Sequence, residues 1–317
     1  MALLAADETG WELEQYVTTT QQNSDFIHFV LCNRNGKKQG KDAWIRFHGS
    51  NAVVRDELSG VHRELMKMFS QSVPWILENG DVDTIYTFVT TETTAYGGYF
   101  HDLCQDEYRG LNVDYPLGDW GYALVGGEQT KRHLLELSRY GFVPGVSHVT
   151  SVGYSDGGYM SSMNALTGIA QHAVAWGGWV FAQFDDWKAN LPTDASGKCS
   201  LSGLRLDAFI SAGDTFYNGT SGWSHMGPPE SAKSMRGGLR AIASFLDLEE
   251  EPTAEVVVAG IPFQRTVYSN AAEDNVIAIY VDRDSTHAHE WLFHQEALLS
   301  TTARVSKSDR RQCLSAL

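Results

Sequence analysis

The chain has 317 residues, of which 43% are hydrophobic, and a formal net charge of −15. This length suits one large α/β domain or two small ones, with a substantial core. The negative charge argues against nucleic acid and anionic membrane surfaces as partners, because both are negatively charged themselves. No run reaches the roughly 20 apolar residues of a membrane span. Residues 1–6 are too short for the core of a signal peptide, so we expect a cytoplasmic protein.

Short apolar runs alternate with amphipathic stretches along the chain, which predicts an α/β fold with a mostly parallel central sheet flanked by helices. We expect residues 1–40 to form an N-terminal segment packed on a main domain of residues 41–317. The predicted strands are residues 26–31, 43–47, 84–89, 148–152, 173–176, 206–211, 255–258, 265–268 and 276–281. The predicted helices are residues 53–71, 128–140, 158–168, 231–246 and 290–299. Two irregular stretches, residues 96–120 and 183–203, are typical of lids or binding loops.

The most informative motif is Gly153-Tyr154-Ser155-Asp156-Gly157-Gly158, which fits the Gly-x-Ser-x-Gly pattern of a nucleophile elbow. An elbow needs glycine on both sides because a strained strand-to-helix turn leaves no room for side chains there. A predicted strand precedes the motif and a predicted helix follows it, as an elbow requires. Ser155 is therefore the candidate nucleophile, and the alternative is a Gly/Ser turn in an ordinary βα unit.

A serine nucleophile needs a base and an acid that orients this base, in the chain order Ser, Asp or Glu, His. Asp214 follows an apolar strand and Gly213, and it is preferred as the acid over Asp185 or Asp186. Asp207 lies at the opening of that strand, which is the wrong end for this role. His289 follows the last predicted strand and is preferred as the base over His287.

The oxyanion hole needs two backbone N–H groups, one of which comes from the residue after the nucleophile, Asp156. The other is expected from the loop after residues 43–47, with Ser50 as the donor and Gly49 as the alternative. Aromatic walls suit apolar, sugar or phenolic groups. The candidate substrate-binding residues are His48, Trp120, Trp179 and Trp223.

With these residues assembled, the chain resembles the esterase/polyhydroxybutyrate-depolymerase family of α/β-hydrolases, which includes feruloyl esterase-like members. The resemblance spans roughly residues 44–291. It implies an α/β-hydrolase fold, a Ser/Asp/His triad and hydrolysis of a carboxylic ester, which would be a small ester, an aromatic acyl ester or a polyester. It rests on His48-Gly49, the elbow motif, Ala212-Gly213-Asp214 with Tyr217-Asn218-Gly219, and His289-Glu290-Trp291. The chain departs from the family at residues 285–288, where a Gly-rich run is usual, and at Leu292, where proline is common.

Other functions remain open at this point. His287 and His289 resemble the start of a metallo-β-lactamase zinc cluster, but Trp291-Leu292 stands where that cluster needs Asp-His. His101, Cys104 and Asp106 form a second possible ligand group. The four cysteines form no CxxC pair. A binding protein on a hydrolase scaffold, a serine peptidase and an acyltransferase are the further alternatives. We expect no metal or organic cofactor and an ester as the substrate, while the oligomeric state stays open.

Overall fold

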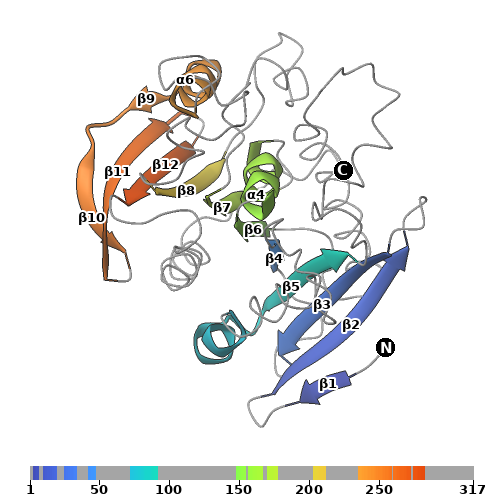
Figure 1. Cartoon of the computed structure of the whole chain (residues 1–317). Helices are drawn as coiled ribbons and strands as arrows, with labels where there is room; N and C mark the ends of the chain where they lie inside the picture. The colour runs from blue at the N-terminus through green and yellow to red at the C-terminus, as the bar shows by residue number, and fades with distance from the viewer. Residues whose placement is uncertain are drawn as a thin grey trace, which may run out of the picture. The chain divides into compact units, whose positions relative to one another are not determined.

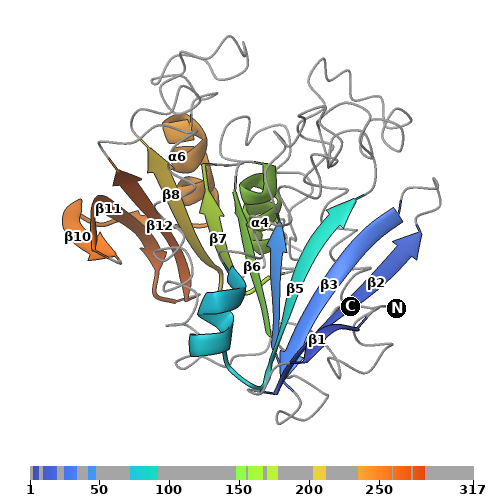
Figure 2. The same ribbon diagram turned by 60° about the horizontal axis from the view of Figure 1, so that its bottom comes forward.

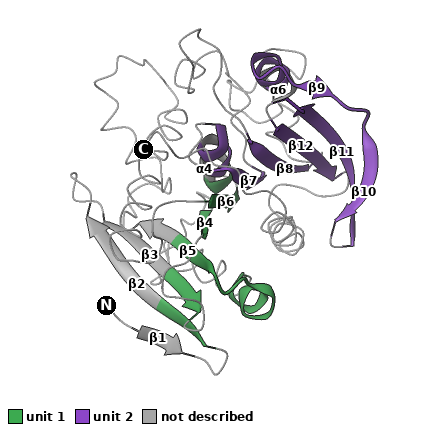
Figure 3. Cartoon of the chain, turned by 180° about the vertical axis from the view of Figure 1, so that it is seen from behind, with its two compact units in different colours: residues 1–160 green, residues 161–317 purple. Residues whose placement is uncertain are grey.

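The computed structural model divides the chain into two compact units, residues 1–160 and residues 161–317, which are described separately (Figure 3). The residues that the structure describes are 3–6, 10–19, 25–33, 42–47, 72–91, 148–154, 156–166, 170–177, 203–211, 235–258, 260–272 and 274–282.

The described elements are mostly strands, and three helices lie between them (Figure 1). The strands of the first unit are β1 (Leu3–Ala6), β2 (Trp11–Thr19), β3 (Asp25–Asn33), β4 (Asp42–Phe47), β5 (Thr84–Thr91) and β6 (His148–Tyr154). Those of the second unit are β7 (His172–Trp176), β8 (Arg205–Ser211), β9 (Glu249–Glu250), β10 (Ala254–Val258), β11 (Ile261–Asn270) and β12 (Asn275–Asp282). The described helices are residues 72–79, α4 (Asp156–Leu166) and α6 (Met235–Phe245).

In the first unit the strands lie in the order β1-β2-β3-β5-β4-β6. β4 pairs in parallel with both β5 and β6, whereas β1, β2 and β3 add antiparallel pairs on the β5 side (Figure 2). Parallel neighbours need a crossover connection, and residues 72–79 lie in the one between β4 and β5. The pairing of β3 with β5 brings part of residues 1–40 into this sheet, while the domain boundary near residue 40 stays a prediction.

The core of the first unit contains one large charged side chain. β4 is buried from Ala43 to Phe47, as a strand covered on both faces should be. Arg46 is fully buried there and donates a hydrogen bond to Ser72 Oγ, so the 72–79 helix packs against β4. The Tyr86 ring lies between those of Trp11 and Trp44, at centroid distances of 5.7 and 5.5 Å.

In the second unit the strands lie in the order β7-β8-β12-β11-β10. β7, β8 and β12 are parallel, and β11 and β10 follow as antiparallel strands. Trp176, Phe209 and Tyr280 are register partners on the three parallel strands, so their rings stack in one row, with centroids 4.9 and 4.5 Å apart. Phe263 of β11 contacts all three rings edge-on. This aromatic row is a large part of the buried core of the second unit.

The outermost described strand of the second unit is β10, and β9 pairs with the same side of β11. Residues 249–255 are exposed, and they include four glutamates and Pro252. Val257 is 70% exposed. Charged residues and proline are common on sheet edges because they discourage pairing with another chain.

All nine predicted strands are confirmed, and each is longer than its predicted run. Two predicted helices are confirmed as α4 and α6, the first beginning two residues earlier than expected. The 72–79 helix and strands β1, β2 and β9 were not predicted. The predicted helices at 53–71, 128–140 and 290–299 lie outside the described residues, as do the irregular stretches apart from residue 203.

Candidate active site

The predicted elbow lies between β6 and α4. β6 ends at Tyr154 and α4 begins at Asp156, so one residue separates the strand from the helix. A Cβ atom added to Gly153 would collide with the backbone carbonyl of Gly157 and would lie 2.8 Å from the backbone nitrogen of Gly158. The chain therefore reverses so sharply that the glycines on the two sides of the motif pack backbone against backbone. This is the geometry that a nucleophile elbow requires.

Helix α4 is built for close packing rather than for a wide amphipathic face. Its described side chains are buried, and several of them are small, among them Ser161, Ser162 and Ala165. Two glycines follow Asp156, and they let the first turn approach the end of β6. Beyond the helix, the Ala170 N–H donates to the carbonyl of Asn164 at 2.8 Å and turns the chain towards β7.

The predicted oxyanion segment follows the strand next to the elbow strand. β4 and β6 are parallel, and Phe47, the last residue of β4, is the register partner of Gly153. The chain leaves β4 into His48, Gly49 and Ser50 at the level where β6 enters the elbow. A loop that donates a hydrogen bond to the oxyanion must leave the sheet at the same edge as the nucleophile turn.

The predicted acid and base also follow neighbouring parallel strands, here in the second unit. β8 and β12 pair along their length, and their last residues, Ser211 and Asp282, are register partners. Asp214 comes shortly after Ser211, and His289 comes after Asp282. The predicted acid and base segments therefore start from the same edge of the parallel strands of the second unit.

Most of the predicted site residues lie outside the described part of the chain. Asp156 is described, as the first residue of α4. The residues outside it are His48, Gly49, Ser50, Trp120, Ser155, Trp179, Asp185, Asp186, Asp214, Trp223, His287 and His289. The zinc alternatives at 286–290 and at His101, Cys104 and Asp106 lie outside it as well. The convergence of the triad stays a prediction.

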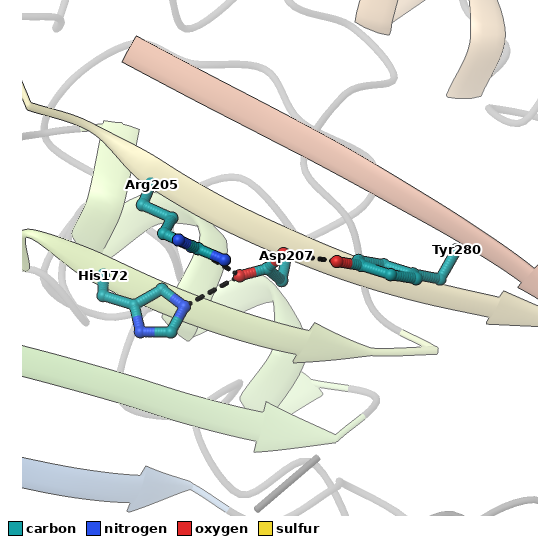
Figure 4. A network of polar contacts seen from close by, with 4 residues as sticks. All are labelled: His172, Arg205, Asp207 and Tyr280. Carbon is teal, nitrogen blue, oxygen red and sulfur yellow. Dashed lines mark hydrogen bonds and ion pairs between the residues drawn. The ribbon is translucent and has the colours of Figure 1, made fainter. Parts of the chain in front are cut away.

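Sequence reasoning gave Asp207 no role, and the structure shows a buried polar network around it (Figure 4). Its carboxylate accepts hydrogen bonds from His172 Nε2 at 2.9 Å, Arg205 Nε at 3.1 Å and the Tyr280 hydroxyl at 3.1 Å. Burial alone would raise the pKa of Asp207, but the hydrogen bond from His172 and the charge and hydrogen bond of Arg205 hold this pKa below its usual range. A carboxylate within an otherwise apolar strand is the signal that could have found this network.

Within the described ranges, no group of three histidine, cysteine or acidic side chains is close enough to hold a metal ion. None of the described helices is long and apolar enough to cross a membrane.

Comparison with known proteins decides the fold. The chain is similar to the solved structure of siderophore hydrolase EstB from Aspergillus nidulans, with a TM-score of 0.52 and 12% sequence identity over 98% of this chain and 100% of that one. It is also similar to an S-formylglutathione hydrolase from Agrobacterium tumefaciens, with a TM-score of 0.51 and 9% identity over 96% and 99% of the two chains. The chain has the α/β-hydrolase fold. No family model and no curated protein matches the sequence.

The α/β-hydrolase fold relates the strand ends described above to one another. In this fold the nucleophile lies on the turn after a strand, a loop near the amino-terminal part of the chain supplies an oxyanion donor, and the acid precedes the histidine. β6 with α4, the end of β4, the end of β8 and the end of β12 occur here in the matching chain order.

Proposed function

We propose that the protein is a serine hydrolase that cleaves a carboxylic ester through an acyl-enzyme. The observation that carries the proposal is the backbone contact of Gly153 with Gly157 and Gly158 across the turn that contains Ser155. A fold alone does not determine a function. A turn this tight between a strand and a helix, with a serine at its apex, is the part of an α/β-hydrolase that performs the chemistry.

The proposed reaction uses five residues in the order that the fold provides. Ser155 Oγ attacks the ester carbonyl while His289 accepts its proton, and Asp214 orients and stabilises the imidazolium. The backbone N–H groups of Ser50 and Asp156 bind the oxyanion. The C–O bond then breaks, and His289 gives its proton to the leaving alcohol. Water attacks the acyl-enzyme, again with His289 as the base, and the proton returns to Ser155.

The substrate class follows from the resemblance to the esterase/polyhydroxybutyrate-depolymerase family. We propose a small ester, an aromatic acyl ester or a polyester, contacted by His48, Trp120, Trp179 and Trp223. Both EstB and S-formylglutathione hydrolase carry the word hydrolase in their names, which agrees with this reaction class. The proposed chemistry needs no metal or organic cofactor, and we propose that the protein acts in the cytoplasm.

The decisive experiment compares the wild type with Ser155→Ala on a short p-nitrophenyl ester. The matched control is Ser244→Ala, because Ser244 is an exposed serine on α6. Loss of a nucleophilic serine costs roughly 10⁶-fold in kcat when the triad acts as a unit. We expect turnover to vanish in Ser155→Ala and to persist in Ser244→Ala, with unchanged circular dichroism in both. Turnover retained in Ser155→Ala excludes the serine mechanism.

Two further measurements separate the alternatives. A fluorophosphonate probe should label the wild type once and leave Ser155→Ala unlabelled, whereas a non-catalytic binding protein takes up no label. Incubation with EDTA should leave the rate unchanged, whereas a zinc enzyme loses activity. Parallel Asn substitutions at His287 and His289 should identify which imidazole acts as the base.

A further inference from the structure

The network around Asp207 links three neighbouring parallel strands through one carboxylate (Figure 4). His172 comes from β7, Asp207 and Arg205 come from β8, and Tyr280 comes from β12. His172 and Arg205 are the first residues of their strands, whereas the proposed catalytic segments follow the last residues. The network therefore lies outside the proposed active site and has a separate explanation.

The hydrogen bonds of the network place one proton on His172. The Arg205 guanidinium, whose Nε atom lies 3.1 Å from Asp207 Oδ2, lowers the pKa of Asp207. Asp207 is therefore ionised near neutral pH and only accepts hydrogen bonds. His172 Nε2 lies 2.9 Å from Asp207 Oδ2 and must therefore carry the hydrogen. His172 is fully buried, and its Nδ1 atom has no hydrogen-bond partner in the described part of the chain. A hydrogen on Nδ1 would add both a buried donor without an acceptor and a positive charge, which costs more than a buried lone pair without a donor.

The charges of the network also favour a single hydrogen on His172. Arg205 keeps its guanidinium charge at any pH that proteins experience, and its Nε atom lies 3.1 Å from the Asp207 carboxylate. That pair is already neutral overall. A second cation, the Arg265 guanidinium of β11, lies 5.7 Å above the centre of the Tyr280 ring. An imidazolium at His172 would add an uncompensated positive charge to a buried cluster, and such a charge is costly.

We propose that Arg205, and not His172, carries the charge that balances Asp207, and that His172 is held as a neutral imidazole with its hydrogen on Nε2. The hydrogen bonds of the network then hold β7, β8 and β12 together, and their contribution to stability does not require a protonated histidine. The one partly exposed member, Arg205 with 40% of its side chain exposed, sets the protonation state of its buried neighbour. Without this guanidinium, Asp207 needs another cation, and His172 is the group in contact that can become one.

Nitrogen NMR of protein labelled with ¹⁵N-histidine tests this charge assignment at a single pH slightly above neutral. In the wild type we expect one buried histidine whose Nε2 resonance is that of an N–H nitrogen and whose Nδ1 resonance is that of a bare nitrogen. In Arg205→Met both nitrogens of this histidine should become N–H nitrogens. Arg205→Lys, which restores a cation, should return the wild-type pattern. Arg240→Met is the matched control, because Arg240 is exposed on α6 and outside the network.

The resonance that changes in Arg205→Met and not in Arg240→Met identifies His172 without a substitution in the core. A doubly protonated His172 in the wild type overturns the proposal, and so does a hydrogen on Nδ1 alone. A His172 signal that is the same in the wild type and in Arg205→Met overturns it as well.

Thermal unfolding gives a second readout that general destabilisation would not produce. In Arg205→Met the folded state should hold a proton on His172 that the unfolded state releases as the pH rises through the histidine range. The difference in Tm between the wild type and Arg205→Met should therefore widen with rising pH. A difference that stays constant, or that narrows, contradicts the proposed role of Arg205.

Discussion

Phe47 and Gly153 are register partners at the ends of the parallel strands β4 and β6. The backbone after Gly153 closes onto Gly157 and Gly158, while the backbone after Phe47 continues into His48-Gly49-Ser50. The two segments that the proposed mechanism uses to attack a carbonyl and to bind its oxygen therefore leave the same edge of one sheet. Short, local constraints therefore fix the two strand ends from which these segments start.

The elbow gives the first prediction. In Gly153→Ala the new methyl group meets the backbone of Gly157 and Gly158, and backbone has little freedom to move away. We expect a loss of about 2–3 kcal/mol in the free energy of unfolding, as for overpacked sites, and a large loss of esterase activity because the turn shifts. Urea unfolding and a p-nitrophenyl ester assay measure the two effects. Gly203→Asn is the control: Gly203 has φ of +70° and open space around it, and asparagine tolerates that conformation. Equal losses in both variants would contradict the steric explanation.

Asp207 gives the second prediction. Asp207→Asn turns one acceptor oxygen into an amide that faces the donors His172 and Arg205, so the buried His172 and the partly exposed Arg205 lose their acceptor. We expect a loss of about 3 kcal/mol in the free energy of unfolding, the scale seen when one side of a buried charged pair is removed. Urea unfolding measures it. Asp247→Asn serves as the control, because Asp247 is exposed and has φ of 54°, which asparagine accepts. That control should stay within about 0.5 kcal/mol of the wild type.

The same carboxylate predicts how stability changes in acid. The pKa of Asp207 in the folded state lies below the ordinary value of 3.8. Its ionised form therefore stabilises the fold above pH 3.8, and this contribution is lost as the pH falls through the lower, folded-state pKa. The difference in unfolding free energy between the wild type and Asp207→Asn should be constant above pH 3.8 and should shrink below pH 3.8. Acid titration followed by circular dichroism checks this, and a difference that grows in acid would contradict it.

At alkaline pH the buried tyrosines determine how the free energy of unfolding changes with pH. Burial raises the pKa of Tyr280 from 10.0 to about 12, and the charge of Asp207 adds to this rise. Burial likewise raises the pKa of Tyr86 to about 12. The unfolded state releases these protons first, so stability is lost between pH 10.0 and about 12. The loss is about 1.4 kcal/mol per pH unit for each tyrosine. Tyr280→Phe should make the alkaline slope of the unfolding free energy shallower, and an unchanged slope would show that Tyr280 does not contribute.

The aromatic row gives the last prediction. Phe209 stacks on both Trp176 and Tyr280 and touches Phe263 edge-on. Phe209→Ala removes the middle ring and leaves a cavity, so we expect a loss of about 3–5 kcal/mol in the free energy of unfolding. Val257→Ala should cost less than about 0.5 kcal/mol, because that side chain is 70% exposed. Chemical unfolding of the two variants measures the contrast, and a small effect at Phe209 would mean that the row repacks.

Local patterns predicted the elements whose signal is local. β4, β7 and β8 are short apolar runs, and the turn glycines around Ser155 are adjacent in sequence, so the sequence alone indicates both the strands and the elbow. β2 begins with Trp11 and Leu13 alternating with Glu12 and Glu14, which is the pattern of a half-buried strand, and sequence analysis missed this signal. The carboxylate of Asp207 within an apolar strand indicates a buried polar site, but its partners could not be predicted because they lie 35 and 73 residues away. For the same reason, the sequence predicts the chain order of the proposed triad and not its contacts.

The acidic outer strand of the second unit has a consequence for handling the protein. Val256, Val257 and Val258 are a short stretch of high β propensity, and Glu255 directly precedes them. Together with the glutamates of residues 249–251 and with Pro252, this carboxylate repels an incoming strand of a second molecule. Exchange of Glu255 for valine would lengthen the aggregation-prone run of valines and remove the charge that discourages pairing with another chain. Concentrated stocks of that variant should turn cloudy on warming well before those of the parent, even where both unfold at the same temperature.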